Sequence, residues 1–348
     1  MAVKGFFGLG ARTFGNPSGR TPGGGGSTPV LTPLNWTSRG NITGPNEPRA
    51  MAVSSGLNPN VALLIDDALN LHRSLNGGRT WAALAPVPPQ ANFFPGTLAY
   101  GAGVWLWVQD AVDQILARST DNGATWNPVN TNMTAFGGTQ YLGTDGAGTW
   151  VCWANVVGGA NLRFARSTDN GVTFASGPDP LGGGTLTGAP VWTGSEFVAP
   201  AVSAALAPII VTSPNGLVWT ALPFTNAAGT IDVVTRLGSL FVSNDLLGPN
   251  EYSGASPAGL AASFPNALVP AVLPSNLLFT LGGPVNLYAF DSAGNVANSL
   301  DAVTFVLGGQ NFPGGETMGT NQRFCTFYDA RAQSACVISS AGSVCTFP

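Results

Sequence analysis

The sequence contains two nearly identical stretches, Arg118-Ser-Thr-Asp-Asn-Gly-Ala-Thr-Trp126 and Arg166-Ser-Thr-Asp-Asn-Gly-Val-Thr-Phe174. Two looser copies are Arg73-Ser-Leu-Asn-Gly-Gly-Arg-Thr-Trp81 and Val211-Thr-Ser-Pro-Asn-Gly-Leu-Val-Trp219. All four share an Asn or Asp, a fixed glycine and an aromatic residue three positions after that glycine. The fixed glycines are Gly78, Gly123, Gly171 and Gly216, at spacings of 45, 48 and 45 residues. A period of this length predicts an array of similar structural units.

A second repeated element precedes the later copies. It is a tight glycine turn followed by an aromatic-rich strand, as in Tyr100-Gly-Ala-Gly-Val-Trp-Leu-Trp107 and Thr144-Asp-Gly-Ala-Gly-Thr-Trp-Val151. Such a turn between two strands indicates a hairpin. Each period therefore holds four antiparallel strands, a to d, with the motif turn between c and d. This pattern is typical of a β-propeller blade.

The fold class predicted is all-β, a propeller of seven four-stranded antiparallel blades, with six as the alternative count. Asp291-Ser-Ala-Gly294 and Ser339-Ser-Ala-Gly342 are interpreted as worn copies of the motif turn. The segment around Leu34–Ile42 is expected to add a closing strand to the last blade, because ring closure removes exposed sheet edges. The expected blades are 50–88, 96–134, 139–180, 187–226, 230–268, 275–306 and 315–348.

Composition agrees with this fold and narrows the function. The chain has 348 residues with 47 Gly and 27 Pro, which suits short strands and tight turns. Charged residues are 9% and the net charge is −4, so no basic surface for nucleic acid is expected. No apolar run reaches 18 residues, which argues against membrane insertion. The first ten residues lack a sustained apolar region, so no signal peptide is expected.

The repeats resemble the Asp-box (BNR) repeat of sialidases and other propellers, over residues 50–348. This resemblance implies that the motif residues build turns and do not form an active site. A short Asp or Asn side chain can accept hydrogen bonds from backbone amides two residues on, and glycine adopts conformations that other residues resist. The predicted structural residues are Asn76, Gly78, Trp81, Asp121, Gly123, Trp126, Asp169, Gly171, Phe174, Asn215, Gly216 and Trp219.

The opposite end of the ring, formed by b–c loops, is the candidate ligand-facing end, because loops on a rigid scaffold commonly carry binding residues. Carboxylates gathered there would bind a cation or sugar hydroxyls, or act as acid and base; the alternative is that they are solvated turn residues. The candidates are Arg49, Asp66, Asp67, Asp110, Asp113, Asp245, Asp329 and Arg331.

Sialidase chemistry is poorly supported by these residues. The family uses three arginines, a Tyr/Glu pair, an acidic residue and an Arg-Ile-Pro motif, whereas Arg49 here is followed by Ala-Met and only Arg331 joins it at that end. Glu251 and Tyr252 are adjacent in sequence, which does not supply a facing pair. His72 is the only histidine, which disfavours a hydrolase triad and a zinc site. No catalytic residue, metal or cofactor is predicted.

Residues 1–33 form a separate Gly/Pro-rich segment that includes Gly23-Gly24-Gly25-Gly26 and carries positive charge only. Such a segment cannot bury enough apolar surface to order itself, so we expect it to be an arm held by other protein chains. This arrangement resembles structural proteins of tailed bacteriophage particles, where the propeller over residues 34–348 would be displayed in many copies and would contact host glycan or protein. The alternatives are a sialidase-like hydrolase or lectin, and a protein-binding propeller of the photosystem-assembly or sorting-receptor type.

The last three cysteines lie close together in the sequence. A hairpin of 322–328 with 334–339 would place Cys325 opposite Cys336, whereas a turn centred on Ser340-Ala341 would place Cys336 opposite Cys345. Either pair could form a disulfide, and all three could equally be buried thiols.

Overall fold

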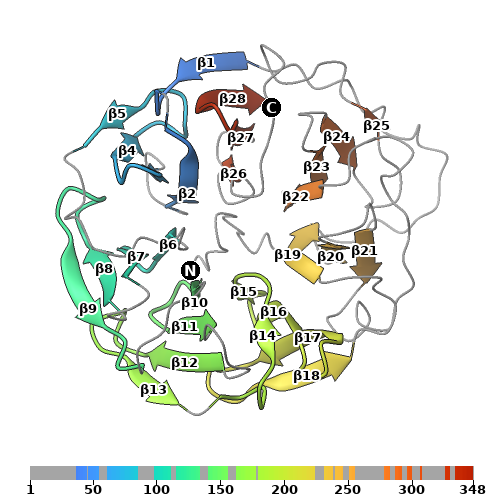
Figure 1. Ribbon diagram of the computed structural model, residues 1–348. Coiled ribbons are helices and arrows are strands. Elements are labelled where there is room, and N and C mark those ends of the chain that lie inside the picture. Colours follow the sequence, from blue (N-terminus) through green and yellow to red (C-terminus); the bar gives the residue numbers. More distant parts are fainter. Residues whose placement is uncertain are drawn as a thin grey trace, which may run out of the picture.

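The computed structural model is a closed ring of β-sheets (Figure 1). It describes residues 37–44, 46–54, 61–84, 98–110, 115–133, 140–155, 162–177, 179–223, 231–237, 240–245, 251–254, 278–282, 287–291, 296–299, 306–307, 326–329 and 334–347. Within these residues the strands assemble into seven antiparallel sheets arranged around a common axis, which is a seven-bladed β-propeller.

The strands follow one another outward in each blade, from the axis to the rim. The first two blades are β2 (Pro48–Val53), β3 (Ala62–Asp66), β4 (Leu71–Ser74) and β5 (Ala82–Ala83), then β6 (Leu98–Gly101), β7 (Val104–Asp110), β8 (Ile115–Ser119) and β9 (Asn127–Asn130). The third is β10 (Gln140–Thr144), β11 (Trp150–Asn155), β12 (Leu162–Ser167) and β13 (Ala175–Gly177). The fourth is β14 (Thr185–Leu186), β15 (Val191–Trp192), β16 (Phe197–Val202), β17 (Pro208–Ser213) and β18 (Thr220–Pro223).

The remaining blades complete the ring. The fifth has three described strands, β19 (Ile231–Leu237), β20 (Leu240–Asp245) and β21 (Glu251–Gly254). The sixth is β22 (Leu278–Gly282), β23 (Leu287–Asp291), β24 (Val296–Ser299) and β25 (Val306–Leu307). The seventh is β26 (Thr326–Asp329), β27 (Ser334–Ile338), β28 (Ser343–Phe347) and β1 (Thr37–Asn41). The predicted fold class and the count of seven are therefore confirmed.

The ring is closed by the predicted latch. β1 pairs antiparallel with β28, with Thr37 opposite Thr346, and so forms the outermost strand of the seventh blade. The Ile42 amide donates to the Gly342 carbonyl at 3.0 Å, and Arg39 Nε donates to the Thr346 hydroxyl at 2.9 Å. Backbone pairing across the two ends of the described chain thus joins the last blade to the first.

The prediction that Gly294 and Gly342 belong to c–d motif turns is wrong. Gly294 lies between the second and third strands of its blade, β23 and β24, and Ser339–Gly342 lies between β27 and β28, again the second and third strands. The Gly342 amide donates to Ser339 O at 3.0 Å, which repeats the Leu206 to Ser203 bond of the β16–β17 turn at 2.8 Å. Gly342 therefore serves a b–c turn, in which it is left-handed with φ +81°, whereas Gly294 itself lies outside the described residues.

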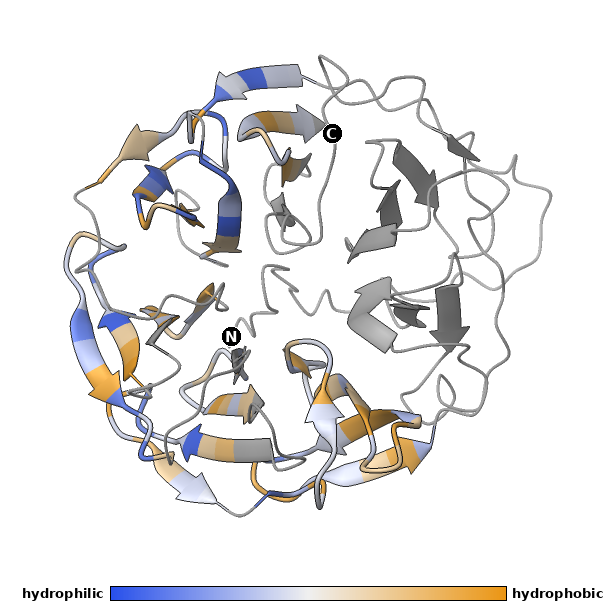
Figure 2. Ribbon diagram, in the orientation of Figure 1, coloured by the Kyte–Doolittle hydropathy of each residue, from blue (hydrophilic) through white to orange (hydrophobic). Residues whose placement is uncertain are grey.

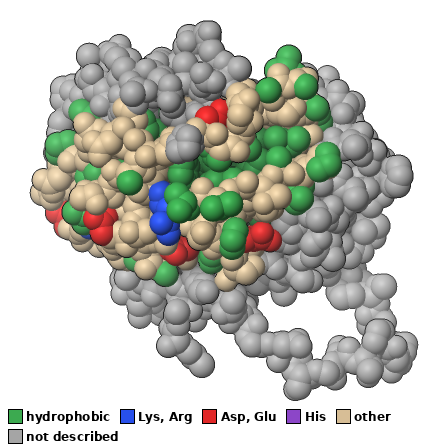
Figure 3. All heavy atoms as spheres, turned by 90° about the horizontal axis from the view of Figure 1, so that it is seen from below, with side chains coloured by type: hydrophobic (Ala, Val, Ile, Leu, Met, Phe, Trp, Pro, Cys, Tyr) green, Lys and Arg blue, Asp and Glu red, His purple; other side chains and the backbone are tan. Residues whose placement is uncertain are grey.

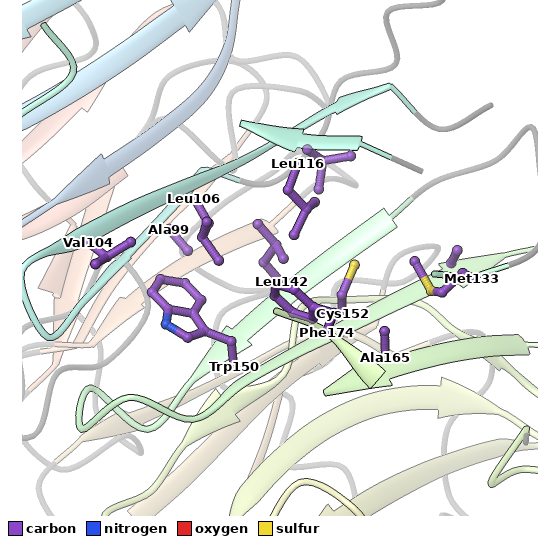
Figure 4. Close-up of a cluster of buried hydrophobic side chains, with 12 residues drawn as sticks. Ala99, Val104, Leu106, Leu116, Met133, Leu142, Trp150, Cys152, Ala165 and Phe174 are labelled. Carbon is purple, nitrogen blue, oxygen red and sulfur yellow. The ribbon is translucent and has the colours of Figure 1, made fainter. Parts of the chain in front are cut away.

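The hydrophobic core lies in the seams between neighbouring blades. Figure 4 shows the seam between the second and third blades, where Leu106 and Leu116 of one sheet face Leu142 and Trp150 of the next. Rim strands have little part in it: β1, β5 and β9 are largely exposed, and β1 is hydrophilic in Figure 2. Burial of alternate strand faces between blades is what holds the ring together.

The register of the last blade differs from both predicted cysteine pairings. Cys336 lies opposite Phe327 on one side and opposite Thr346 on the other, while Cys345 lies opposite Val337. Cys336 and Cys345 are both buried, and neither faces the other across the strands. Cys325 lies outside the described residues.

Among the described residues, no helix has the length and apolar character needed to span a bilayer.

The fixed glycines are predicted to be essential to the seams. Gly171 has φ +75°, and a Cβ there would lie 2.9 Å from Leu106 Cδ1 of the preceding blade. Gly171→Ala should lower the free energy of unfolding by roughly 3 kcal/mol, since it combines backbone strain with a clash in a packed seam. Gly194 has φ +100° with open space around it, so Gly194→Ala should lose roughly 1 kcal/mol from strain alone. Equal losses in urea unfolding would show that the seam contact is unimportant.

Candidate functional site

The repeated turns at the c–d end are built around a buried serine. The hydroxyl of Ser74, Ser119, Ser167 or Ser213 accepts a hydrogen bond from the amide of the fixed glycine at 2.9 Å in every copy. These serines are at most 1% exposed. The turn is therefore organised from inside the sheet, and its outer residues are left to solvent.

The predicted Asp and Asn residues support the outer part of each turn. Asp169 Oδ1 accepts from the Thr173 amide at 2.9 Å, and Asp169 Oδ2 accepts from the Thr173 hydroxyl at 2.6 Å. Asp121 repeats both bonds with Thr125. In these two copies the main bond reaches an amide four residues on, not two as the sequence indicated. Asn76 bonds Thr80 in the same way, whereas Asn215 bonds Leu217 and Val218.

The aromatic residue of each turn packs into the seam with the preceding blade. Trp126, Phe174 and Trp219 join successive clusters between the first and second, second and third, and third and fourth blades. Trp81 packs in the seam between the seventh and first blades. Trp81 and Trp126 also donate their indole N–H to the carbonyl of their own fixed glycine, at 2.9 and 3.1 Å.

Arginines connect one blade to the turn of the next. Arg73 Nη1 donates to Asn122 O at 3.3 Å, and Arg118 Nε donates to Asn170 O at 3.2 Å. Asn122 and Asn170 are left-handed, with φ of 58° and 62°. Their side-chain oxygens accept from the indoles of Trp105 and Trp150, at 3.3 and 3.2 Å respectively. One asparagine therefore accepts two donors at each of these positions.

The fourth turn is one residue shorter than the others. Ser213 reaches Gly216 over three positions, whereas Ser119 reaches Gly123 and Ser167 reaches Gly171 over four. The missing residue is the left-handed asparagine. Accordingly Phe197, opposite Ser213, stands where Trp150 lies opposite Ser167.

The c–d end also carries most of the exposed hydrophobic side chains. Of the five large hydrophobic residues that are exposed in the described part of the chain, only Leu206 lies in a b–c turn. The other four lie in repeated turns: Leu75 (49% exposed), Val172 (54%), Leu217 (53%) and Val218 (64%). Sequence reasoning missed this surface, although the apolar letters within otherwise polar turns were a visible signal.

At the opposite end, Asp66 proves to be a structural residue. Its side chain is fully buried, and its carboxylate accepts from the amides of Ala68 and Asn70 and from the side chains of Asn46 and Asn70, at 2.9 to 3.2 Å. His72 Nε2 lies 3.2 Å from Asp66 Oδ2 and is also buried. The expectation that Asp66 faces a ligand is therefore wrong, because no accessible surface is left on it.

Arg49 and Asp67, predicted to face a ligand, lie beside this network. Arg49 Nη2 is 3.0 Å from Glu47 and 4.0 Å from Asp67, and the Glu47 amide donates to Asp67 Oδ1 at 3.0 Å. The side chains of Arg49 and Asp67 are 23% and 37% exposed. These interactions fix the start of β2 against the end of β3 and leave a small polar surface.

The other residues predicted to face a ligand lie at different ends of the ring, according to the strand that carries each of them. Asp110 and Asp245 end β7 and β20, both second strands, so their backbones lie at the b–c end. Asp329 ends β26, the innermost strand, which places it at the end with the repeated turns and corrects its predicted location. The side chains of these three residues, and the whole of Asp113 and Arg331, lie outside what the structure describes.

The described chemistry offers few reactive groups. In the described ranges no three His, Cys, Asp or Glu residues come together as metal ligands. Burial raises the pKa of the Cys152 thiol to about 12, so that thiol is protonated at neutral pH and is a poor nucleophile. The single histidine is committed to Asp66.

Comparisons with solved structures agree with the fold. A structure of YCF48 bound to D1 peptide matches with a TM-score of 0.65 and 15% identity, covering 91% of this chain and 96% of that one. Virginiamycin B lyase from Staphylococcus aureus matches with a TM-score of 0.63 and 10% identity, covering 90% and 99%. BamB from Moraxella catarrhalis matches with 0.51 and 12%, covering 91% and 99%. The chain is a β-propeller. At these identities the likeness concerns the fold alone.

Neither a protein-family model nor a curated protein matches this sequence.

Removing the Asp66 carboxylate should destabilise the propeller. Asp66→Ala leaves His72 and two backbone amides buried without their acceptor, and we expect a loss of about 3–5 kcal/mol in the free energy of unfolding. Asp67→Ala is the matched control, because Asp67 is more exposed and its ion pair should be worth less than about 1 kcal/mol. Urea unfolding of both variants at neutral pH measures this difference. Similar losses in both would contradict the structural role of Asp66.

Acid should weaken the third repeated turn in a defined pH range. Burial raises the pKa of Asp169, but hydrogen bonds from Thr173, Ser167 and Val172 outweigh it and lower the pKa from 3.8 to about 2. Folding thus favours the charged carboxylate, whose contribution is complete above the unfolded-state pKa and is lost as pH falls through the folded value. Asp169→Asn should therefore reduce stability at pH 7 by less than about 1 kcal/mol, and the difference should disappear between pH 4 and pH 2. Measuring unfolding at several pH values checks this; a constant difference would contradict it.

Proposed function

We propose that this chain is a non-enzymatic binding propeller within a larger protein assembly. The observation that carries the proposal is the apolar surface at the c–d end, where Val172, Leu217 and Val218 are each more than half exposed. Solvated turns are normally polar, and exposed apolar residues in several turns at the same end of the ring favour a protein contact. The low charge content of 9% supports the same proposal, because surface charges oppose association between proteins and this chain has few of them.

The polar groups argue for binding rather than catalysis. Asp66 and His72 hold each other in the first blade, and Asp121 and Asp169 hold their turns. Each of these carboxylates already accepts hydrogen bonds from groups of the protein and is therefore poorly placed to bind a substrate. A glycoside hydrolase would have to draw its acid and base from other residues, so we favour the binding function.

The finer parts of this proposal concern the assembly. We propose that residues 1–33 attach the chain to a bacteriophage particle and that the propeller is displayed on it, where it would contact host protein or glycan. The resemblance of the turns to Asp-box repeats and the Gly-rich composition of the arm support this placement. The peptide bound to YCF48 supports recognition of protein by a ring of this shape.

Fractionation of the source material tests the proposal. The full chain should sediment with particles far heavier than one chain, and a variant lacking residues 2–33 should move to the single-chain fraction. The purified full chain should release no sugar from sialosides. Sedimentation of the full chain as a monomer, together with sialoside turnover, would replace this proposal with the hydrolase alternative.

A further inference from the structure

The contact between the third and fourth blades, here called the third seam, differs from the two seams before it. In the seams between the first three blades, Arg73 and Arg118 each donate to the carbonyl of a left-handed asparagine in the next turn. Arg166 occupies the same position in β12, immediately before Ser167. Its Nε is buried and has no hydrogen-bond partner.

The shortened fourth turn explains this unsatisfied donor. The carbonyl that would accept from Arg166 belongs to the residue that the fourth turn lacks, because Ser213 and Gly216 are only three positions apart. A buried charged donor without an acceptor normally costs about 1–3 kcal/mol or more, so protein folds rarely retain one without a use.

Register and packing place Arg166 beside that turn. Arg166 lies opposite Val151, and a Cβ on Gly216 would lie 2.6 Å from Val151 Cγ1. Leu106 has the same relation to Arg118 and Gly171 in the preceding seam. Equivalent positions thus bring Arg166 to the fourth turn as Arg118 is brought to the third.

The third and fourth turns both carry exposed apolar residues. Val172 follows Gly171 in the third turn, and Leu217 and Val218 follow Gly216 in the fourth. Figure 3 views this side of the ring, and it shows hydrophobic side chains gathered across the middle with both basic and acidic side-chain atoms at their margin. A positive group beside an apolar surface suits a ligand that carries both a negative charge and apolar side chains.

Two indoles in this seam also lack acceptors, but they do not carry the argument. Trp153 Nε1 and Trp219 Nε1 are buried without a partner. Their rings are 4.8 Å apart in an edge arrangement, within a cluster of aromatic side chains. Arg166, by contrast, is partly exposed and can meet a partner protein.

We propose that the third seam binds an extended acidic and apolar peptide of a partner protein. A carboxylate of the peptide takes the place of the missing turn carbonyl at Arg166, and neighbouring apolar side chains cover Val172, Leu217 and Val218. A carboxylate fits better than a neutral carbonyl because it both accepts from the guanidinium and neutralises its charge. This inference rests on the proposed binding function and assigns it a site.

Fluorescence anisotropy of the full chain tests the site with a labelled, end-capped peptide Ser-Leu-Asp-Leu-Asp-Leu-Ser. We expect a Kd below about 1 mM, and at least tenfold weaker binding of the same peptide with Asn in place of Asp. Arg166→Met should weaken binding of the acidic peptide at least tenfold while leaving Tm unchanged or raised, since it removes an unsatisfied donor. Arg118→Met is the matched control, and it should lower Tm but retain peptide binding, because Arg118 already has its acceptor.

A second variant restores the missing acceptor. Inserting one asparagine between Asn215 and Gly216 gives the fourth turn the length of the second and third, so its carbonyl can accept from Arg166. This variant should have a Tm raised by about 2 °C and peptide binding weakened at least tenfold.

Equal binding to the parent and Arg166→Met, or to the Asp and Asn peptides, would overturn the site, as would no binding at ~1 mM peptide. If the chain still sediments with large particles, only this site is wrong. If the peptide does not bind and the full chain also sediments as a single chain, both the site and the proposed binding function are wrong.

Discussion

The second, third and fourth blades are each held to the preceding blade by a close contact between a backbone turn and a side chain. The fixed glycines Gly123, Gly171 and Gly216 have φ of 79°, 75° and 70°, and each lies against a side chain of the preceding blade, Leu63, Leu106 or Val151. A glycine is needed there for two reasons at once, since any other residue would strain the turn and would also enter the seam. The regular spacing of the glycines is therefore a consequence of packing between blades.

The contacts between blades also explain why certain pairs of residues are either both present or both replaced from one blade to the next. Trp150 and Asn170 occur together because the indole N–H needs the side-chain oxygen of the asparagine. Where the asparagine is missing from the fourth turn, Phe197 takes the place of the tryptophan and has no N–H that would need this acceptor. Arg166 did not change in the same way, and it is this mismatch that marks the third seam as different from its neighbours.

The sequence predicted the fold well because the repeated turns are local structures. Asp169 needs only Thr173 and Ser167 nearby, so these residues identify the turn, and the spacing of the turns gives the length of a blade. Glycine alone was a poor guide: Gly294 and Gly342 were interpreted as motif turns, yet they lie between second and third strands. Burial was also invisible, and Asp66 was expected at a ligand when four hydrogen-bond donors and His72 enclose it.

The sequence around Arg166 does not show that this arginine lacks an acceptor, because Arg73, Arg118 and Arg166 occupy the same position in the motif. What distinguishes it is a residue absent from a turn about fifty positions later, and only the strand register shows that this turn lies against it. The third seam depends on a pairing between blades, which a local pattern does not encode.

The pairing in the seventh blade constrains the order in which the protein folds during translation. During synthesis β1 leaves the ribosome before every other described strand, while its partner β28 is the last to emerge. Throughout translation the blades can form one by one, yet the ring stays open and β1 remains a strand without its neighbour. A nascent chain of this design cannot close its ring until β28 has emerged, and in that interval its unpaired edges are open to pairing with another copy.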